Sequence, residues 1–467
     1  MQIYLYQEFT IQSLTPGDKD LWFLPLGGTG EIGMNMNLYG HAGQWLMMDC
    51  GITFNSPLCT EAESKTSVLH KHDVVAADPG FISQRKEQLA GIVITHAHED
   101  HLGALPYLWR RFKCPVYTTK YTAEILRRKL ARGGLGDNIP IIEIDSGERV
   151  DIGEFNVEWM LITHSLPEPH AFVIRTSAGN VFHTADWKID LAPVTDKPFN
   201  SHPFKLLAKQ DILAMVCDST NATREGYSVS EQQCYKGLKQ AVVNAKGRVV
   251  VGCFSSNIAR LITLAKIAKE TGRYFALFGR SLQNTVGAAK ATGHWPDDLP
   301  ILDAFNAGYL LPREVLAVAT GSQGEPRAAL NQLAKDTYRN ASLDEGDLVM
   351  FSSIVIPGNE KSIENLLKAY KSRKINTLMA DDSELPIHAS GHPCQEELKQ
   401  MYEWVRPQIA IPTHGEVEHL QANAEMARLS HVPRSLTGLN GDLFKLAPEV
   451  KVIKQAVKAG RIALQQS

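Results

Sequence analysis

The segment from His96 to Pro106, HAHEDHLGALP, restricts the possible folds of this chain more than any other stretch. It follows the apolar run GIVIT and places three imidazoles and two carboxylates within six residues. Gathering so many basic nitrogens and carboxylate oxygens without a cation is costly in desolvation and partly in repulsion. A divalent metal removes that cost, so the segment predicts a metal site rather than a polar loop with coincidental histidines.

Short apolar runs that end at an acid or a histidine recur along the chain. Ligands of α/β proteins gather outside the carboxyl ends of strands, so these endings indicate where the chemistry lies. The local groups of HAHEDH cannot complete two coordination spheres, and distant strand ends must therefore contribute. The six endings are Asp49, His96, His164, Asp186, Asp218 and His414.

The types of side chain narrow the choice of metal. Imidazoles and carboxylates without a thiolate suit Zn²⁺, and also Mn²⁺ or Fe. His96 and His98 lie two residues apart on an extended segment and can point to the same side, and a helix is expected over about 102–112. The seven cysteines are odd in number and form no C-x-x-C pair, so they predict neither a disulfide framework nor a cysteine zinc site.

A second glycine-rich motif, PLGGTGEIG, has the spacing G-x-G-x-x-G at Gly28, Gly30 and Gly33. A dinucleotide site requires a helix that begins at these glycines, because its first turn binds the pyrophosphate. The following residues, MNMNLYGHAGQWLMMD, instead predict a β-hairpin. The motif therefore lacks its context, and a dinucleotide-binding fold is excluded.

Composition and charge set wider limits. With 467 residues, of which 44% are hydrophobic, the chain should divide into more than one folded unit. No signal peptide or membrane span is evident, so we expect a cytoplasmic protein with no membrane partner. A net charge of −3 neither supports nor excludes a nucleic-acid partner.

The middle of the chain, from about residue 221 to 372, alternates between strand, small-residue loop and helix. This rhythm predicts βα units and an inserted α/β domain. The loops are rich in Ser, Gly and Asn at helix starts, where phosphate can bind, although helix capping explains any single loop equally well. Three such loops, with Arg260 and Arg327 near two of the helix starts, favour a substrate that carries phosphate.

A series of blocks gives the chain a family resemblance. In order, they include LPLGGTGEIGMNM, MDCGITF, GIVITHAHEDHLGALPYL, FHTADWKID, CDSTNA, ATGSQGEP, VIPGNE, HASGHP and PTHGE, from about residue 24 to 416. Together they resemble the ribonuclease J group of the β-CASP nucleases, within the metallo-β-lactamase superfamily. The resemblance implies an αββα sandwich of residues 1–220 and 373–467, with a β-CASP domain of residues 221–372 inserted into it.

The same resemblance implies roles for individual residues. Two metal ions would lie at the domain junction, with Asp186 as the bridging ligand. They would be zinc, with manganese as the alternative. One metal would take His96, His98 and His164, and the other would take Asp100, His101 and His414. The expected catalytic residues are Asp49, which orients the cluster, Asp100, Asp218, and His392 as the acid or transition-state stabiliser. The expected phosphate-binding residues are His388, Ser390, Gly391, Ser255, Ser256, Asn257, Ser322, Gln323, Gly324 and Glu325.

The expected function is metal-dependent hydrolysis of single-stranded RNA in RNA processing and decay. The enzyme would act as a 5′-to-3′ exonuclease, an endonuclease or both, on RNA with a 5′-monophosphate. Residues 417–467 are too few for the family's further C-terminal domain, so a short form is expected and a homodimer is an open expectation. A small-molecule hydrolase of thioesterase or lactonase type, and a silent RNA-binding partner of an active paralogue, are the alternatives.

Overall fold

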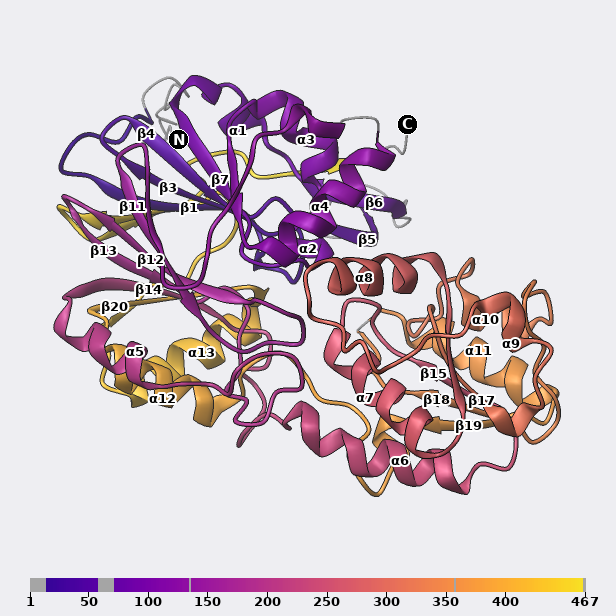
Figure 1. Cartoon of the computed structure of the whole chain (residues 1–467). Helices are drawn as coiled ribbons and strands as arrows, with labels where there is room; N and C mark the ends of the chain where they lie inside the picture. The colour runs from indigo at the N-terminus through magenta and orange to yellow at the C-terminus, as the bar shows by residue number, and fades with distance from the viewer. Residues whose placement is uncertain (1–13, 58–70, 134–135, 357, 465–467) are drawn as a thin grey trace, which may run out of the picture.

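The computed structural model describes residues 14–57, 71–133, 136–356 and 358–464. The chain forms a sandwich of two β-sheets between layers of helices, and a second α/β part beside it (Figure 1). The fold expected from the sequence is therefore confirmed. Among the described residues, none of the helices is long and apolar enough to cross a membrane. Cys59 and the first residues of the chain lie outside the described ranges, and the other cysteines are buried and unpaired.

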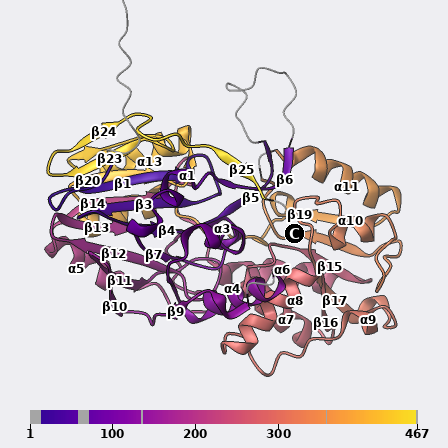
Figure 2. The ribbon, with the colours of Figure 1, turned by 90° about the horizontal axis from the view of Figure 1, so that it is seen from above.

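The first sheet of the sandwich has eight strands and joins the two ends of the chain. Figure 2 shows the C-terminal strands β23 and β24 beside the N-terminal strand β1, and β1 pairs with β23 in antiparallel register. The order is β24 (Lys451–Ile453), β23 (Leu443–Ala447), β1 (Leu21–Gly27), β3 (Met36–His41), β4 (Gln44–Met48), β7 (Leu89–Val93), β8 (Val116–Thr118) and β9 (Ile141–Glu143).

The glycine-rich motif lies between β1 and β3 of this sheet. Gly28, Gly30 and Gly33 have φ values of 86°, 86° and 93°, a left-handed conformation that glycine adopts at little cost. No helix begins there within the described residues, and β3 and β4 form an antiparallel hairpin. The exclusion of a dinucleotide-binding fold is confirmed.

The second sheet has seven strands and changes direction in the middle. Strands β10 to β13 are antiparallel to their neighbours, whereas β13, β14, β20 and β22 run parallel. The order is β10 (Arg149–Ile152), β11 (Phe155–Leu161), β12 (His170–Thr176), β13 (Gly179–His183), β14 (Ile212–Asp218), β20 (Ile409–Thr413) and β22 (Arg434–Ser435).

Consecutive apolar residues, whose side chains point to opposite faces in turn, allow a strand to be buried on both faces. In β1, Leu21 and Phe23 face the other sheet, while Trp22 and Leu24 face the helix layer. The helices over the first sheet are α1 (Gly80–Ser83), α3 (Leu105–Phe112) and α4 (Lys120–Arg132), and those over the second are α5 (His202–Leu206), α12 (Gln395–Val405) and α13 (Val417–Leu429).

The second part of the molecule is built on a five-stranded parallel sheet. Its order is β16 (Tyr274–Phe278), β17 (Val315–Ala319), β15 (Val249–Gly252), β18 (Leu348–Phe351) and β19 (Asn376–Met379). Strand β19 lies beyond residue 372, where the inserted domain was expected to end, and the domain division stays a prediction. The helices of this part are α6 (Cys234–Asn244), α7 (Ile258–Glu270), α8 (Arg280–Ala291), α9 (Ala304–Ala307), α10 (Ala329–Ala334) and α11 (Glu360–Ser372).

The two parts touch where Arg128 of α4 donates a hydrogen bond of 3.2 Å to the Gly287 carbonyl of α8.

Short elements complete the chain. One small sheet pairs β2 (Thr29–Gly30) with β21 (Gly415–Glu416). Another has β6 (Lys71–Ala77) between β25 (Arg461–Ala463) and β5 (Ile52–Pro57). The short helices are α2 (Glu99–Leu102), η2 (Lys86–Gln88), η3 (Gly136–Asn138), η4 (Leu207–Lys209), η5 (Glu231–Gln233), η6 (Pro312–Glu314) and η7 (Ala380–Asp382).

The core between the two sheets yields a prediction about stability. Phe172 is fully buried there, with its ring centroid 5.4 Å from that of Trp159. Phe172→Ala should lower the free energy of unfolding by about 3–5 kcal/mol, because it leaves a cavity between the sheets. Urea denaturation followed by circular dichroism measures the change. Phe305→Ala is the control, since Phe305 is 58% exposed. Equal losses for the two variants would contradict the assigned core.

Candidate metal centre

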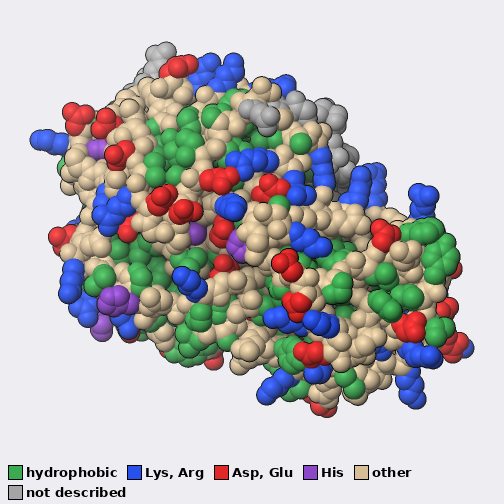
Figure 3. All heavy atoms as spheres, viewed as in Figure 1, with side chains coloured by type: hydrophobic (Ala, Val, Ile, Leu, Met, Phe, Trp, Pro, Cys, Tyr) green, Lys and Arg blue, Asp and Glu red, His purple; other side chains and the backbone are tan. Residues whose placement is uncertain are grey.

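The predicted metal residues lie at one edge of the sandwich, where strands of both sheets end. His96 and His98 follow β7, and His164, Asp186 and His414 follow β11, β13 and β20. Asp100 and His101 lie in the short helix α2, just before the expected helix, which the structure places at Leu105–Phe112 as α3. In Figure 3, histidine and acidic side chains appear at the boundary between the two parts of the molecule.

The first group consists of His96, His98, His164 and Asp186, whose ligand atoms lie within 4.8 Å of one another. Nδ1 of His98 is 3.0 Å from Nε2 of His96 and 3.2 Å from Nε2 of His164. Oδ2 of Asp186 is 3.7 Å from Nε2 of His96. Three imidazole nitrogens and a carboxylate oxygen therefore converge on one point.

The second group consists of Asp100, His101, Asp186 and His414. Nε2 of His101 lies 3.2 Å from Oδ2 of Asp186 and 3.5 Å from Oδ2 of Asp100. Nε2 of His414 lies 3.3 Å from Oδ2 of Asp100, and its Nδ1 lies 2.8 Å from Oδ1 of Asp186. Asp186, which is 2% exposed, belongs to both groups and lies between them.

Hydrogen bonds from outside the groups orient their rings. Asp49 accepts from Nδ1 of His101 at 2.7 Å and from the Thr95 hydroxyl at 3.0 Å. Because the Thr95 hydroxyl donates to Asp49, it accepts from Nδ1 of His96 at 2.9 Å. The rings of His96 and His101 thus use Nδ1 outside the groups and turn Nε2 toward them, the arrangement by which outer residues fix metal-binding histidines.

The five histidines of the two groups differ in the direction in which their pKa values are shifted. Burial lowers the pKa of His96 and His164 well below the ordinary value and that of His98 to about 4. Burial also opposes protonation of His101 and His414, but the surrounding carboxylates, Asp186 foremost, together outweigh it and raise both pKa values well above the ordinary value. Without a cation, protons on His101 and His414 balance the buried carboxylates, while the other three histidines are neutral.

The residues fit a divalent cation in each group. A ligand nitrogen must offer a lone pair, which a neutral imidazole does. In tetrahedral zinc sites with Zn–N bonds of about 2.0–2.1 Å, ligand nitrogens lie roughly 3.3 Å apart, close to the separations within the first group. Nε2 of His414 is buried and forms no well-aligned hydrogen bond among the described residues, and it lies 3.3 Å from Oδ2 of Asp100, another possible ligand of the same group.

The predicted catalytic pair lies beside both groups. Nδ1 of His392 donates to Oδ2 of Asp218 at 2.7 Å, and the His392 ring lies 5.2 Å from that of His164. Burial opposes protonation of His392, but Asp218 and Asp186 outweigh it and raise its pKa. Nδ1 is therefore engaged, and Nε2 is left to exchange a proton.

The predicted phosphate-binding residues form two sets. His388, Ser390 and Gly391 belong to the segment that ends at His392, and the Gly391 carbonyl accepts from Nδ1 of His164 at 2.6 Å. Burial lowers the pKa of His388 to about 3. This set touches the metal residues directly.

The second set lies in the loops after β15 and β17. There the side chains of Asn257 and Gln323 form hydrogen bonds within the protein. Asn257 caps α7 by accepting from the Arg260 amide at 2.8 Å. The side chain of Gln323 donates to the Ile354 carbonyl at 2.8 Å and accepts from the Ile356 amide at 2.9 Å. A phosphate-binding role for these loops stays a prediction, as it does for the neighbouring residues Ser255, Ser256, Ser322, Gly324 and Glu325.

Arg260, one of the two arginines near the helix starts, gives no support to a phosphate-bearing substrate. Arg260 is fully buried, and its guanidinium forms an ion pair with Glu231 and donates to the carbonyls of Ser352 and Ile387. All this hydrogen-bonding capacity is used inside the protein, so Arg260 cannot contact a substrate phosphate. Arg327, by contrast, is exposed.

Two residues at the site were missed in the sequence. The side-chain amide of Asn35 donates to the Asp100 carbonyl at 3.1 Å and lies 3.1 Å from Nε2 of His101. Asn221 contacts the segment that carries His392. Asn35 lies two residues after the last of the three glycines of PLGGTGEIG. The tight turn that these glycines predict was the one sequence signal that pointed to Asn35.

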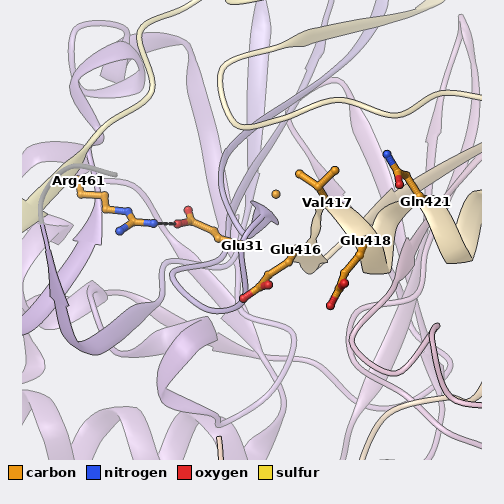
Figure 4. A pocket seen from close by; sticks show the side chains of 7 residues that line it. Glu31, Glu416, Val417, Glu418, Gln421 and Arg461 are labelled. Atoms are coloured by element: carbon orange, nitrogen blue, oxygen red, sulfur yellow. Dashed lines mark hydrogen bonds and ion pairs between the residues drawn. The ribbon is translucent and has the colours of Figure 1, made fainter. Parts of the chain in front are cut away.

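A separate hollow of about 560 Å³ lies outside the two groups (Figure 4). Glu31 and Arg461 form an ion pair on one side of it, and Glu416 and Glu418 lie on the other. Glu416, Glu418 and His419 also form a cluster of possible ligand atoms, but the two glutamates are exposed, and acidic groups of this kind are common without an ion.

Comparison with known proteins agrees with this geometry. Residues 246–369 match the family model "Ribonuclease J, beta-CASP domain", residues 30–191 "Metallo-beta-lactamase superfamily", and residues 386–433 "Zn-dependent metallo-hydrolase RNA specificity domain". The chain is 42% identical to ribonuclease J of Sinorhizobium meliloti, over 95% of this chain and 78% of the relative. It is 35% identical to ribonuclease J of Mycolicibacterium smegmatis, over 96% and 78%.

A solved structure shares the fold. A protein of unknown function from Enterococcus faecalis V583 matches with a TM-score of 0.61 and 16% identity, over 91% of this chain and 100% of that chain. At this identity, the likeness concerns the fold alone.

The shared position of Asp186 yields a prediction about metal content. Asp186→Asn should lower zinc affinity more than about tenfold, because it weakens both groups, and loss of even an outer contact costs 10–100-fold. Elemental analysis after reconstitution with Zn²⁺ and desalting measures the effect. Glu418→Gln is the control and should leave the zinc content unchanged. Full zinc in Asp186→Asn, or loss in Glu418→Gln, would place the metal elsewhere.

Proposed function

Because this chain belongs to the ribonuclease J family of metal-dependent hydrolytic ribonucleases, we propose that it cleaves single-stranded RNA at a centre of two Zn²⁺ ions, with Mn²⁺ as the alternative metal. The observation that carries the proposal is the pair of four-residue groups that share Asp186, with Asp218 and His392 beside them. In this proposal one cation would be held by His96, His98 and His164 and the other by Asp100, His101 and His414, and Asp186 would be shared by both.

The chemistry follows from what each group can hold. Divalent cations supply Lewis acidity, which lowers the pKa of water and stabilises negative charge on phosphate oxygens. Asp218 holds the His392 ring through Nδ1 and leaves Nε2 to donate a proton to the leaving 3′ oxygen. Asp49 fixes the His101 ring from outside the cluster.

Phosphate binding is proposed for the segment from His388 to Gly391, which reaches the cluster. Nε2 of His388 is buried and has no hydrogen-bond partner among the described residues, so it would reach a phosphate oxygen only if substrate binding exposes it. Contacts to the RNA backbone do not distinguish one base from another, so we expect cleavage to show only a weak preference for RNA sequence. A 5′-monophosphate on the RNA, a homodimer and action in the cytoplasm stay predictions.

Two substitutions separate metal binding from proton transfer. Asp186→Ala should remove both metal loading and RNA cleavage, whereas His392→Ala should keep its metal and lower kcat by about 10²–10⁴-fold, the usual contribution of a general acid. Metal analysis beside a single-turnover cleavage assay measures both properties. An active Asp186→Ala protein would overturn the bridging role, and an unchanged kcat in His392→Ala would overturn the acid.

The 5′ end of the RNA tests the proposed substrate. One RNA sequence is prepared with a 5′-monophosphate, triphosphate or hydroxyl and digested under identical conditions, with mapping of the products. Release of mononucleotides from the monophosphate form alone would support 5′-to-3′ exonuclease action on that end, and internal fragments from all three would support endonuclease action. Hydrolysis of a thioester with all three RNAs intact would contradict the proposed function.

A further inference from the structure

The turn formed by Ser390, Gly391 and His392 contacts two functional groups at once. Its middle carbonyl, on Gly391, accepts from Nδ1 of the candidate ligand His164 at 2.6 Å. Its last residue, His392, donates from Nδ1 to Asp218 at 2.7 Å. A single turn of backbone therefore orients a ring of the first metal group and the proposed proton donor.

Gly391 packs directly against the His164 ring, so the turn cannot move closer to the first metal group. A Cβ atom at Gly391 would lie 2.4 Å from Cε1 and 2.6 Å from Nδ1 of His164. Only glycine allows the backbone to approach the ring this closely. Because a carbonyl can only accept, the contact also fixes the proton of His164 on Nδ1 and leaves its Nε2 lone pair for a cation.

Asn221 holds this turn from the other side. Its side-chain amide donates to the Ser390 hydroxyl at 2.8 Å and to the His392 carbonyl at 3.2 Å. Asn221 is 4% exposed, and it lies three residues after Asp218, in a loop closed by the hydrogen bond from the Arg224 amide to the Asn221 carbonyl. The anchor of the turn thus belongs to the same strand end as the partner of His392.

We propose that Asn221 is a positioning residue that sets both the His164 ring and the His392 ring through the 390–392 turn; the proposal rests on the function proposed above. The amide of Asn221 offers two N–H donors, and both are used by the turn. Without them, the half-buried Ser390 hydroxyl and the carbonyl of His392 lose a partner inside the protein, and the turn shifts to recover one. A shift at Gly391 releases His164, and a shift at His392 releases the contact with Asp218.

The rest of the segment stays anchored when Asn221 is changed. The Ile387 carbonyl accepts from Arg260 at 2.9 Å and from the Ser352 hydroxyl at 2.5 Å, on the side of the five-stranded sheet. The expected effect is therefore confined to the turn and leaves the fold intact.

The test compares Asn221→Ala with Thr223→Ala, an exposed position in the same loop. The full chain is loaded with Zn²⁺, and two quantities are measured: the rate of zinc loss to a chelator, and kcat and KM for a single-stranded RNA. Asn221→Ala should lose zinc about 10–100-fold faster and show a kcat lower by a similar factor with little change in KM, the range typical of outer contacts. Thr223→Ala should behave as the unmodified protein.

A second variant covers the case in which Asn221→Ala does not fold. Ser390→Ala removes the other partner of the hydrogen bond, and because Ser390 also lies in the proposed phosphate-binding segment, its readout is zinc loss alone. Zinc loss should be faster, as in Asn221→Ala, and the double variant should lose zinc no faster than the faster single variant. For Asn221→Ala, zinc loss and kcat equal to those of Thr223→Ala, or a change in only one of them, would overturn the proposal, as would unchanged zinc loss in Ser390→Ala. An unmodified protein that holds zinc without cleaving RNA would instead overturn the proposed function.

Discussion

The buried carboxylate of Asp186 is the interaction on which the rest of the site depends. Its oxygens lie within 3.9 Å of ring nitrogens from five histidines, which come from strand ends in both sheets and from the segment returning from the second part. An isolated carboxylate at this depth is unfavourable unless positive charge compensates it. The stacking of the two sheets brings those partners together, so the metal groups depend on the sandwich fold.

Much of this could be predicted from the sequence, because the signals are local. The apolar runs that stop at Asp49, His96, His164, Asp186 and His414 mark strand ends, and the carboxyl ends of neighbouring strands meet at one edge of a sheet. The uninterrupted apolar run of β1 indicates a strand that is buried on both faces, although it does not tell which of Trp22 and Phe23 faces which core. The hairpin after the three glycines follows from the alternating run and the turn residues behind them.

What could not be predicted depends on contacts between distant segments. Arg260 lies in the first turn of α7 after a Ser-rich loop, a position typical of a phosphate site, yet its guanidinium binds Glu231 and the Ile387 carbonyl. Asn221 and Asn35 contact backbone and side-chain groups far along the chain, and such contacts leave no pattern in the sequence around either residue. Their roles required the fold.

The central claim is that two cations share Asp186 between the two histidine groups. Anomalous scattering from a crystal of the zinc-loaded protein, collected on both sides of the zinc absorption edge, tests it most directly. The account predicts two peaks, one among His96, His98, His164 and Asp186, and one among Asp100, His101, Asp186 and His414. Absence of peaks at these positions, or zinc at Glu416, Glu418 and His419 instead, would contradict it.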